Sequence, residues 1–197
     1  KNGFVFQENG TFEKKDLYVE NGKIVSSIEE VTDTAEIDAQ GMKVLPGAVD
    51  VHSHGAFGHD FSDADVEGLK TILRYERSHG VTSYCPTSMT LPKEQLLDIF
   101  ATAVKAGDDK DQARIVGINM EGPFIDPDKK GAHVERHIRK PDIGFFRECN
   151  EKSGRLIKLV TLAPNMEGAD EFIEELKDEV KISIGHTMAG YDTALAA

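Results

Sequence analysis

Hydrophobic and polar residues alternate in two different patterns along the chain, and the first pattern gives way to the second near residue 45. Before it, short apolar stretches separated by turn residues predict β-strands, and Glu-Asn-Gly recurs at two expected hairpin corners, 8–10 and 20–22. After it, longer apolar runs alternate with amphipathic segments. We therefore expect a small all-β part over residues 1–44 and an α/β part over residues 45–197.

The second part carries five apolar runs that predict parallel strands. They lie at 45–52, 81–87, 115–123, 156–164 and 181–187. Between the runs, apolar residues at helical spacing predict helices over 63–80 and 92–107, each of which ends at a glycine. Alternating strands and helices indicate a parallel sheet with right-handed crossovers.

The spacing of these units favours one α/β architecture over another. A closed (β/α)₈ barrel uses roughly 30 residues per unit, which is close to the spacing of the runs. We predict the α/β class and a (β/α)₈ TIM-like barrel that is truncated after about five units, because the last residues form a helical pattern without a cap. The alternative is a five-stranded doubly wound sheet, which would place its chemistry only at a switch point between strands.

Charge and cysteine content narrow the range of partners. Lys and Arg number 23 against 35 Asp and Glu, which gives a formal net charge of −12. Such a surface repels nucleic acid and anionic lipids, and no apolar segment approaches the ~20 residues that a membrane-spanning helix needs. Only Cys85 and Cys149 are present, far apart in sequence. This argues against a disulfide framework, so we expect a cytoplasmic protein.

Polar residues stand at the ends of three predicted strands. His52 and His54 are two apart at the end of the first strand, so alternation places both imidazoles on one face, where they suit zinc or a similar cation. Glu121 ends the third strand and His186 the fifth. Barrel enzymes place their active sites at this edge. We therefore predict a metal site there, although two surface histidines, a salt-bridged glutamate and a core histidine remain the simpler interpretation of each residue alone.

A basic loop over residues 126–142 follows Glu121 in an otherwise acidic chain. Charge runs are usually solvated surface, but the position of this loop makes it a candidate clamp for an anionic substrate. Its basic residues and histidines are Lys129, Lys130, His133, Arg136, His137, Arg139 and Lys140.

Four stretches together resemble the N-acetylglucosamine-6-phosphate deacetylase family of the amidohydrolase superfamily. They are "LPGAVDVHSHG", "MEGPFIDPDKKGAHVERHIRKPD", "VTLAPN" and "SIGHTMAGYDTALAA". The resemblance runs from about residue 3 to the end of the chain. It implies a (β/α)₈ barrel with a small β-sandwich, of which residues 1–44 form part, and removal of the acetyl group from an amino-sugar phosphate.

The same resemblance assigns residues. Glu121 and His186 match metal ligands, His52 and His54 match a second metal position, and Ala132 and His133 match a stretch that contacts the sugar. It implies one or two divalent cations, zinc or iron, and a homodimer. The aspartate that acts as general base would lie beyond residue 197, so we expect these residues alone to be inactive.

Two rival interpretations remain open from the sequence. One is another amidohydrolase, acting on a cyclic amide or a base, although such substrates have no phosphate for the basic loop to bind. The other is a non-catalytic metal-binding fragment. Such a fragment would have a closed, stable fold of its own, whereas a truncated barrel exposes apolar surface and strand edges.

Overall fold

The computed structural model describes residues 1–27 and 35–197, and residues 28–34 of the expected β-part lie outside the described residues. The chain divides into two compact units, Lys1–Gly47 and Ala48–Ala197, which are treated separately below.

The first unit contains short strands, and tight turns at residues 7–11 and 21–22 join two antiparallel pairs. Its strands are β1 (Gly3–Phe6), β2 (Phe12–Lys15), β3 (Tyr18–Glu20), β4 (Lys23–Val25) and β5 (Lys43–Val44). β1 pairs with β2 in antiparallel fashion and with β5 in parallel, and β3 and β4 form a second antiparallel pair. The β3–β4 turn has positive φ at Asn21 (50°) and Gly22 (75°), which is the backbone that an Asn-Gly hairpin corner predicts.

The second unit is built on a parallel sheet whose strands match the five apolar runs. They are β6 (Ala48–Ser53), β9 (Val81–Ser88), β11 (Ile118–Glu121), β12 (Ile157–Leu162) and β13 (Lys181–Ile184), with the short β10 (Arg114–Ile115) also paired to β9. β9 lies between β6 and β11, and β12 separates β11 from β13. A two-stranded antiparallel pair, β7 (Gly55–Ala56) and β8 (His59–Asp60), follows β6.

Helices alternate with the main strands along the chain, as expected. They are α1 (Val66–Ser78), α2 (Lys93–Ala106), α3 (Ile143–Lys152), α4 (Ala169–Leu176) and α5 (Tyr191–Ala196). Asp65 caps α1 through a hydrogen bond from the backbone N–H of Glu67, and Asp142 caps α3 in the same way from Phe145. Gly107 ends α2 with φ of 66°, a conformation that glycine adopts without strain.

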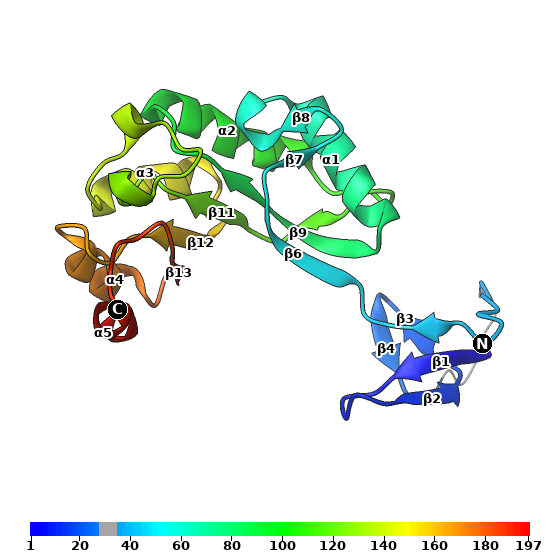
Figure 1. Ribbon diagram of the computed structural model, residues 1–197. Coiled ribbons are helices and arrows are strands. Elements are labelled where there is room, and N and C mark those ends of the chain that lie inside the picture. The colour runs from blue at the N-terminus through cyan, green and yellow to red at the C-terminus, as the bar shows by residue number, and fades with distance from the viewer. Residues whose placement is uncertain (28–34) are drawn as a thin grey trace. The chain divides into compact units, whose positions relative to one another are not determined.

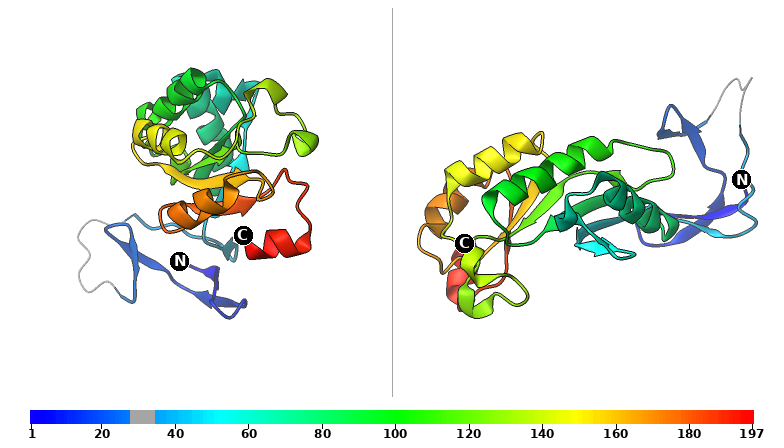
Figure 2. Two further views of the ribbon diagram at one scale, coloured as in Figure 1. Left: turned by 90° about the vertical axis from the view of Figure 1, so that its left-hand side faces the viewer. Right: turned by 90° about the horizontal axis from the view of Figure 1, so that it is seen from above.

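The hydrophobic core lies between the sheet and a layer of helices. Figures 1 and 2 show α1, α2 and α3 along the same side of the sheet. Phe172 of α4 joins this layer, since its ring centroid lies 5.1 Å from Phe124 and 5.8 Å from Phe146. Burial of these aromatic and aliphatic side chains supplies the main free energy that holds helices to strands. The buried aromatic and large aliphatic residues include Phe61, Leu69, Ile72, Tyr84, Leu96, Phe100, Ile118 and Val160.

The strand order distinguishes the two predicted architectures. A doubly wound sheet reverses direction at a switch point and carries helices on both faces. Here the main strands follow one another in chain order, β6, β9, β11, β12 and β13, without a reversal. The second unit is therefore a curled parallel half-barrel, which confirms the prediction of a truncated TIM-like barrel. Cys85 and Cys149 are buried as free thiols.

Strand edges and apolar side chains are exposed within this unit. In the part of the chain that the structure describes, β6 and β13 are each paired on one side only. Val49 and Val51 on β6 are 60% and 49% exposed. Among the described residues, no helix is long and apolar enough to cross a membrane.

Candidate metal centre

Glu121 is the centre of a cluster of imidazoles at the carboxyl ends of the strands. It ends β11 and is only 5% exposed. Its Oε1 lies 3.3 Å from Nε2 of His52 and 3.1 Å from Nε2 of His186. Its Oε2 lies 3.1 Å from Nε2 of His54 and 3.5 Å from Nε2 of His133. Each carboxylate oxygen therefore faces two histidines.

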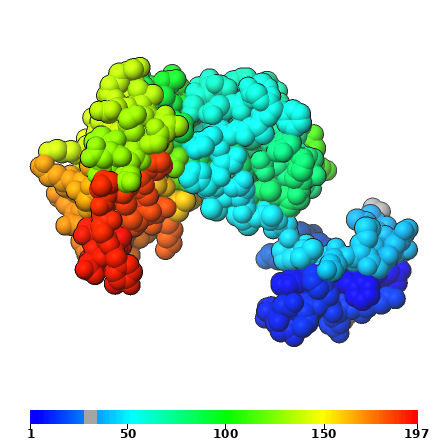
Figure 3. All heavy atoms as spheres, in the orientation of Figure 1, coloured from blue at the N-terminus to red at the C-terminus, as the bar shows by residue number. Residues whose placement is uncertain are grey.

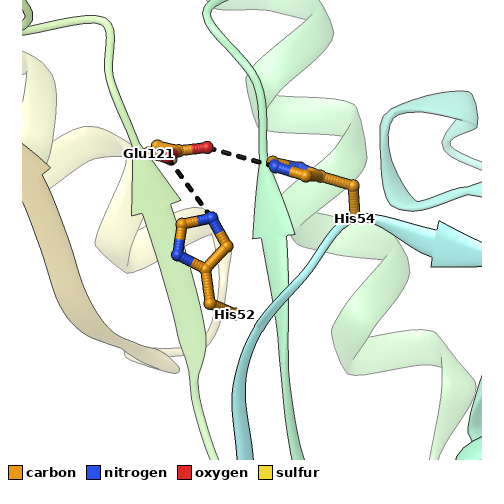
Figure 4. Close-up of side chains that lie close together, drawn as sticks. All are labelled: His52, His54 and Glu121. Atoms are coloured by element: carbon orange, nitrogen blue, oxygen red, sulfur yellow. Dashed lines mark ion pairs between the residues drawn. The ribbon is translucent and has the colours of Figure 1, made fainter. Parts of the chain in front are cut away.

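Strand geometry explains why the first two histidines reach this point. His52 lies on β6 and His54 directly follows it, so the two imidazoles project on the same side and both meet Glu121 (Figure 4). Ser53, between them, turns its backbone toward β9, where its N–H donates to Oγ1 of Thr87 over 3.2 Å and its carbonyl accepts from the Tyr84 hydroxyl over 3.1 Å. The intervening backbone is thus fixed to the neighbouring strand.

The buried side-chain amide of Asn119 supports the cluster around Glu121 from within the sheet. Asn119 is fully buried on β11, two residues before Glu121. Its Nδ2 donates to the Val51 carbonyl over 3.2 Å, and its Oδ1 accepts from the Thr161 hydroxyl over 3.5 Å. This side chain therefore connects β11 to β6 and β12 beneath Glu121 and helps to hold the cluster in place.

His186 reaches the cluster by a turn. β13 ends at Ile184, and His186 has φ of 49°, in the left-handed region. Strand alternation along β13 therefore does not set the orientation of His186. The backbone N–H of Asp126 donates to the His186 carbonyl over 2.9 Å, and this hydrogen bond stabilises the turn.

Hydrogen bonds at Nδ1 determine what Nε2 of two histidines can do. Nδ1 of His54 lies 3.0 Å from the Thr87 carbonyl, and Nδ1 of His186 lies 2.8 Å from the Lys129 carbonyl. A carbonyl only accepts, so both Nδ1 atoms carry a proton. In the neutral ring, Nε2 then presents a lone pair to the Glu121 carboxylate, and either a proton or a cation must lie between them.

His133 has the opposite arrangement. The backbone N–H of Thr90 donates to its Nδ1 over 3.0 Å, so Nδ1 is the acceptor and Nε2 carries the proton in the neutral ring. An Nε2–H group can donate to Glu121 or to a bound molecule, but it has no lone pair for a cation. His133 is 4% exposed and therefore a fixed donor at the edge of the cluster.

The electrostatics of the cluster favour an ionised Glu121. Burial alone would raise the pKa of this carboxyl, but hydrogen bonds from His133 and His54 and the nearby charge of His52 outweigh burial and hold the pKa well below its usual range. In return, the hydrogen bond to Glu121 raises the pKa of His54. The centre is thus a carboxylate that attracts positive charge from several directions.

The donor set fits a divalent cation. The ligand atoms of His52, His54 and Glu121 lie within 4.8 Å of one another, as do those of Glu121, His133 and His186. Imidazole nitrogen with carboxylate oxygen is a ligand set that zinc and other transition metals accept. The protonation of the rings favours His54, His186 and Glu121 as ligands over His133.

The remaining predicted residues are placed around this cluster. Ala132 is exposed, next to His133. Arg136, His137 and Arg139 line a separate pocket of about 270 Å³ together with Lys93, and Lys140 pairs with Glu167. The basic loop therefore contributes His133 to the cluster, while Arg136, His137, Arg139 and Lys140 lie outside it.

Sequence reasoning missed several residues that support the site. They are Thr90, Asn119, Asp126 and Asn165. Thr90 acts through its backbone, Asn119 and Asn165 through side-chain amides, and Asp126 through its backbone and its carboxylate, and these groups have no motif of their own. Only Asn119 could have been identified from the sequence. It is the only polar residue before Glu121 in an apolar run, and a buried amide needs hydrogen-bond partners.

No family model matches the chain. It is 32% identical over 199 residues to N-acetylglucosamine-6-phosphate deacetylase of Mus musculus, covering 95% of this chain and 49% of the relative. It is 37% identical over 166 residues to the Bacillus subtilis (strain 168) enzyme of the same name, covering 81% of this chain and 41% of the relative. The chain thus spans about half the length of the curated relatives it matches.

Solved structures give the same result. The N-acetyl-D-glucosamine-6-phosphate deacetylase of Mycobacterium smegmatis has a TM-score of 0.75 at 28% identity, covering 91% of this chain and 47% of that one. The Thermotoga maritima enzyme has a TM-score of 0.78 at 26% identity, covering 100% of this chain and 50% of that one. A mutant of the Mycobacterium smegmatis enzyme has been solved in complex with N-acetyl-D-glucosamine-6-phosphate.

The curled half-barrel and its relatives place the chain among the amidohydrolase-type α/β barrels. Within that class, it is a homologue of the N-acetylglucosamine-6-phosphate deacetylases, over nearly all of its own length and about half of theirs.

Proposed function

We propose that the chain is part of a metal-dependent hydrolase that removes the acetyl group from N-acetylglucosamine 6-phosphate, giving glucosamine 6-phosphate and acetate. The observation that carries this proposal is the pair of Nε2 lone pairs, on His54 and His186, directed at the buried Glu121 carboxylate. The names of its homologues support the substrate class.

In this proposal Glu121 and His186 hold a divalent cation, zinc or iron, and His52 and His54 provide a second position. A cation there would lower the pKa of bound water and polarise an amide carbonyl. Glu121 remains ionised because its histidine neighbours lower its pKa, so it is available as a ligand at neutral pH. A general-base aspartate would come from beyond residue 197.

His133 and Ala132 are assigned to substrate binding. The Thr90 N–H holds His133 with its Nε2–H pointing toward Glu121, and this group can donate to an oxygen of the amino sugar. A fixed donor is more effective than a mobile one, because it needs no reorganisation when charge develops on its acceptor. Ala132 would contact the same substrate through its backbone or its methyl group.

The first test is metal binding by the chain itself. Equilibrium dialysis against zinc, followed by metal analysis, should give one or two ions per chain, and Glu121→Gln should lose most of this binding. His137→Gln is the matched control, because His137 lies outside the cluster. A parent chain without bound zinc, or an equal loss in the control variant, would refute the metal centre.

The second test is turnover. We expect acetate release from N-acetylglucosamine 6-phosphate by a form extended to the length of the relatives, much slower release from N-acetylglucosamine, and none from residues 1–197 alone. Turnover by residues 1–197 would contradict the assignment of the general base. Equal rates on the two sugars would contradict the phosphate requirement.

The proposal also includes a homodimer in the cytoplasm. Sedimentation equilibrium of the extended form, which should give twice the chain mass, tests the first part.

A further inference from the structure

The side chain of Asn165 connects two segments that surround His186. Its Nδ2 donates to Oδ2 of Asp126, and its Oδ1 accepts from the hydroxyl of Thr187. Asp126 is the first residue of the basic loop, and Thr187 directly follows His186. An amide has a donor at one end and an acceptor at the other, so one side chain satisfies both partners.

Asp126 in turn holds the groups that His186 needs. The Asp126 backbone N–H donates to the His186 carbonyl over 2.9 Å. Its Oδ1 accepts from the Asp128 N–H over 2.8 Å and caps the turn that presents the Lys129 carbonyl. That carbonyl accepts from Nδ1 of His186. Asp126 is 7% exposed, and a buried carboxylate requires such partners.

Thr187 fixes the backbone on the other side of His186. Its hydroxyl donates to Asn165 and accepts from the Ala189 N–H over 2.9 Å. This matters because His186 has φ of 49°, a conformation that a residue with a side chain keeps only when its surroundings hold it. Figure 3 shows the C-terminal segment, in red, packed against the loop in yellow-green that contains Asp126.

We propose that Asn165 and Thr187 are positioning residues for His186, because they lock its turn so that Nδ1–H meets the Lys129 carbonyl and Nε2 meets Glu121. This inference rests on the proposed function, in which His186 is a metal ligand. Neither side chain is hydrogen bonded to the imidazole, and both act through the backbone and Asp126. Groups that orient a ligand commonly change metal affinity by about 10–100-fold when removed.

Two matched pairs of variants test the role. Thr187→Val keeps the shape of threonine and removes the hydroxyl, whereas Thr187→Ser keeps the hydroxyl. Asn165→Asp keeps the shape and the acceptor and removes the donor to Asp126, whereas Asn150→Asp makes the same change in α3, away from the cluster. Zinc affinity is measured by competition with a chromophoric chelator. Thr187→Val and Asn165→Asp should each lose about tenfold, and the other two should stay within about twofold.

A second readout does not depend on metal. In the metal-free chain, the ¹H–¹⁵N spectrum of His186 should contain a downfield Nδ1–H resonance from its hydrogen bond to Lys129. Thr187→Val should weaken or shift this resonance, and Thr187→Ser should preserve it. Asn165 is exposed, so Asn165→Asp supplies the result if Thr187→Val does not fold.

The outcomes separate the two proposals. If the parent chain binds zinc and neither Thr187→Val nor Asn165→Asp changes affinity or the His186 resonance, the positioning role is wrong and the metal centre stands. If the parent binds no zinc but both variants alter the resonance, the positioning role stands and the metal centre is wrong. Equal losses in Thr187→Ser and Thr187→Val would also overturn the role of the hydroxyl.

Discussion

The backbone N–H of Thr90 is hydrogen bonded to Nδ1 of His133 over 3.0 Å, and this contact separates His133 from the other histidines around Glu121. His54 and His186 donate from Nδ1 to carbonyl groups, whereas His133 accepts there. Three of the four imidazoles that face this carboxylate therefore fall into two chemical roles, set by the backbone group behind each ring.

A direct prediction concerns metal affinity at these two kinds of histidine. His133→Gln should leave the zinc affinity of the chain within about threefold, since the ring has no free lone pair. His186→Gln should reduce it by more than about tenfold, because a ligand is lost. Chelator competition measures both, and similar losses in the two variants would show that His133 is also a ligand.

The acid stability of the metal-free chain should depend on Glu121. Its pKa is held below the ordinary value of 4.5, so it stays ionised in the folded state at pH values where the unfolded chain takes up a proton. The resulting stability is present above about pH 4.5 and is lost as the pH falls toward the lower folded value. Glu121→Gln should flatten this part of the curve, by up to about 1.4 kcal/mol per pH unit.

Urea unfolding between pH 6 and pH 3 measures that slope. Glu175→Gln, on α4, is the control, because Glu175 pairs with Arg147 at the surface. The prediction fails if the two variants have the same slope.

Alkaline stability should depend on Tyr84. Burial raises the pKa of this phenol to about 12, from 10.0. The folded state therefore keeps the proton where the unfolded state loses it, and stability falls as the pH rises from about 10 to 12. Tyr84→Phe should be about 1 kcal/mol less stable at pH 8, because the hydrogen bond to the Ser53 carbonyl is lost, and should have a shallower decline above pH 10.

The matched control for this change is Tyr191→Phe, since the ring of Tyr191 is 78% exposed. Its unfolding free energy should follow the parent at every pH. A Tyr84→Phe curve that runs parallel to the parent above pH 10 would disprove the role of burial.

Gly122, directly after Glu121, should not tolerate a side chain. Its φ is 71°, and a Cβ there would lie 2.2 Å from Oγ1 of Thr90. Gly122→Ala should lower the unfolding free energy by more than about 2 kcal/mol, since it combines backbone strain with a clash. Gly58→Ala has a similar φ of 76° with no atom within 4 Å, and should cost only about 1 kcal/mol.

Thermal or urea unfolding of the two glycine variants separates the clash from the strain. Equal losses would mean that Thr90 moves aside without cost.

Strand and helix periodicity was sufficient to predict the half-barrel, because buried parallel strands are continuous apolar runs and Glu121 marks the end of one. It also placed His52 and His54 on one face, since alternation holds inside β6. It could not predict the turn at His186, whose orientation depends on a left-handed backbone and on contacts with Asp126, far away in sequence. Nor could it assign the protonation of His133, which depends on one backbone N–H from Thr90.

Among the described residues, β6 pairs with β9 alone and β13 with β12 alone. Yet His52 lies on β6, His54 directly follows it, and His186 lies two residues beyond the end of β13. Outer strands unfold locally before inner ones, because fewer hydrogen bonds hold them. An ion bound between these two strands and the inner Glu121 would therefore hold both outer strands to the sheet. Its release would follow the fraying of an outer strand, and its capture would make hydrogen exchange in β6 and β13 slow down together.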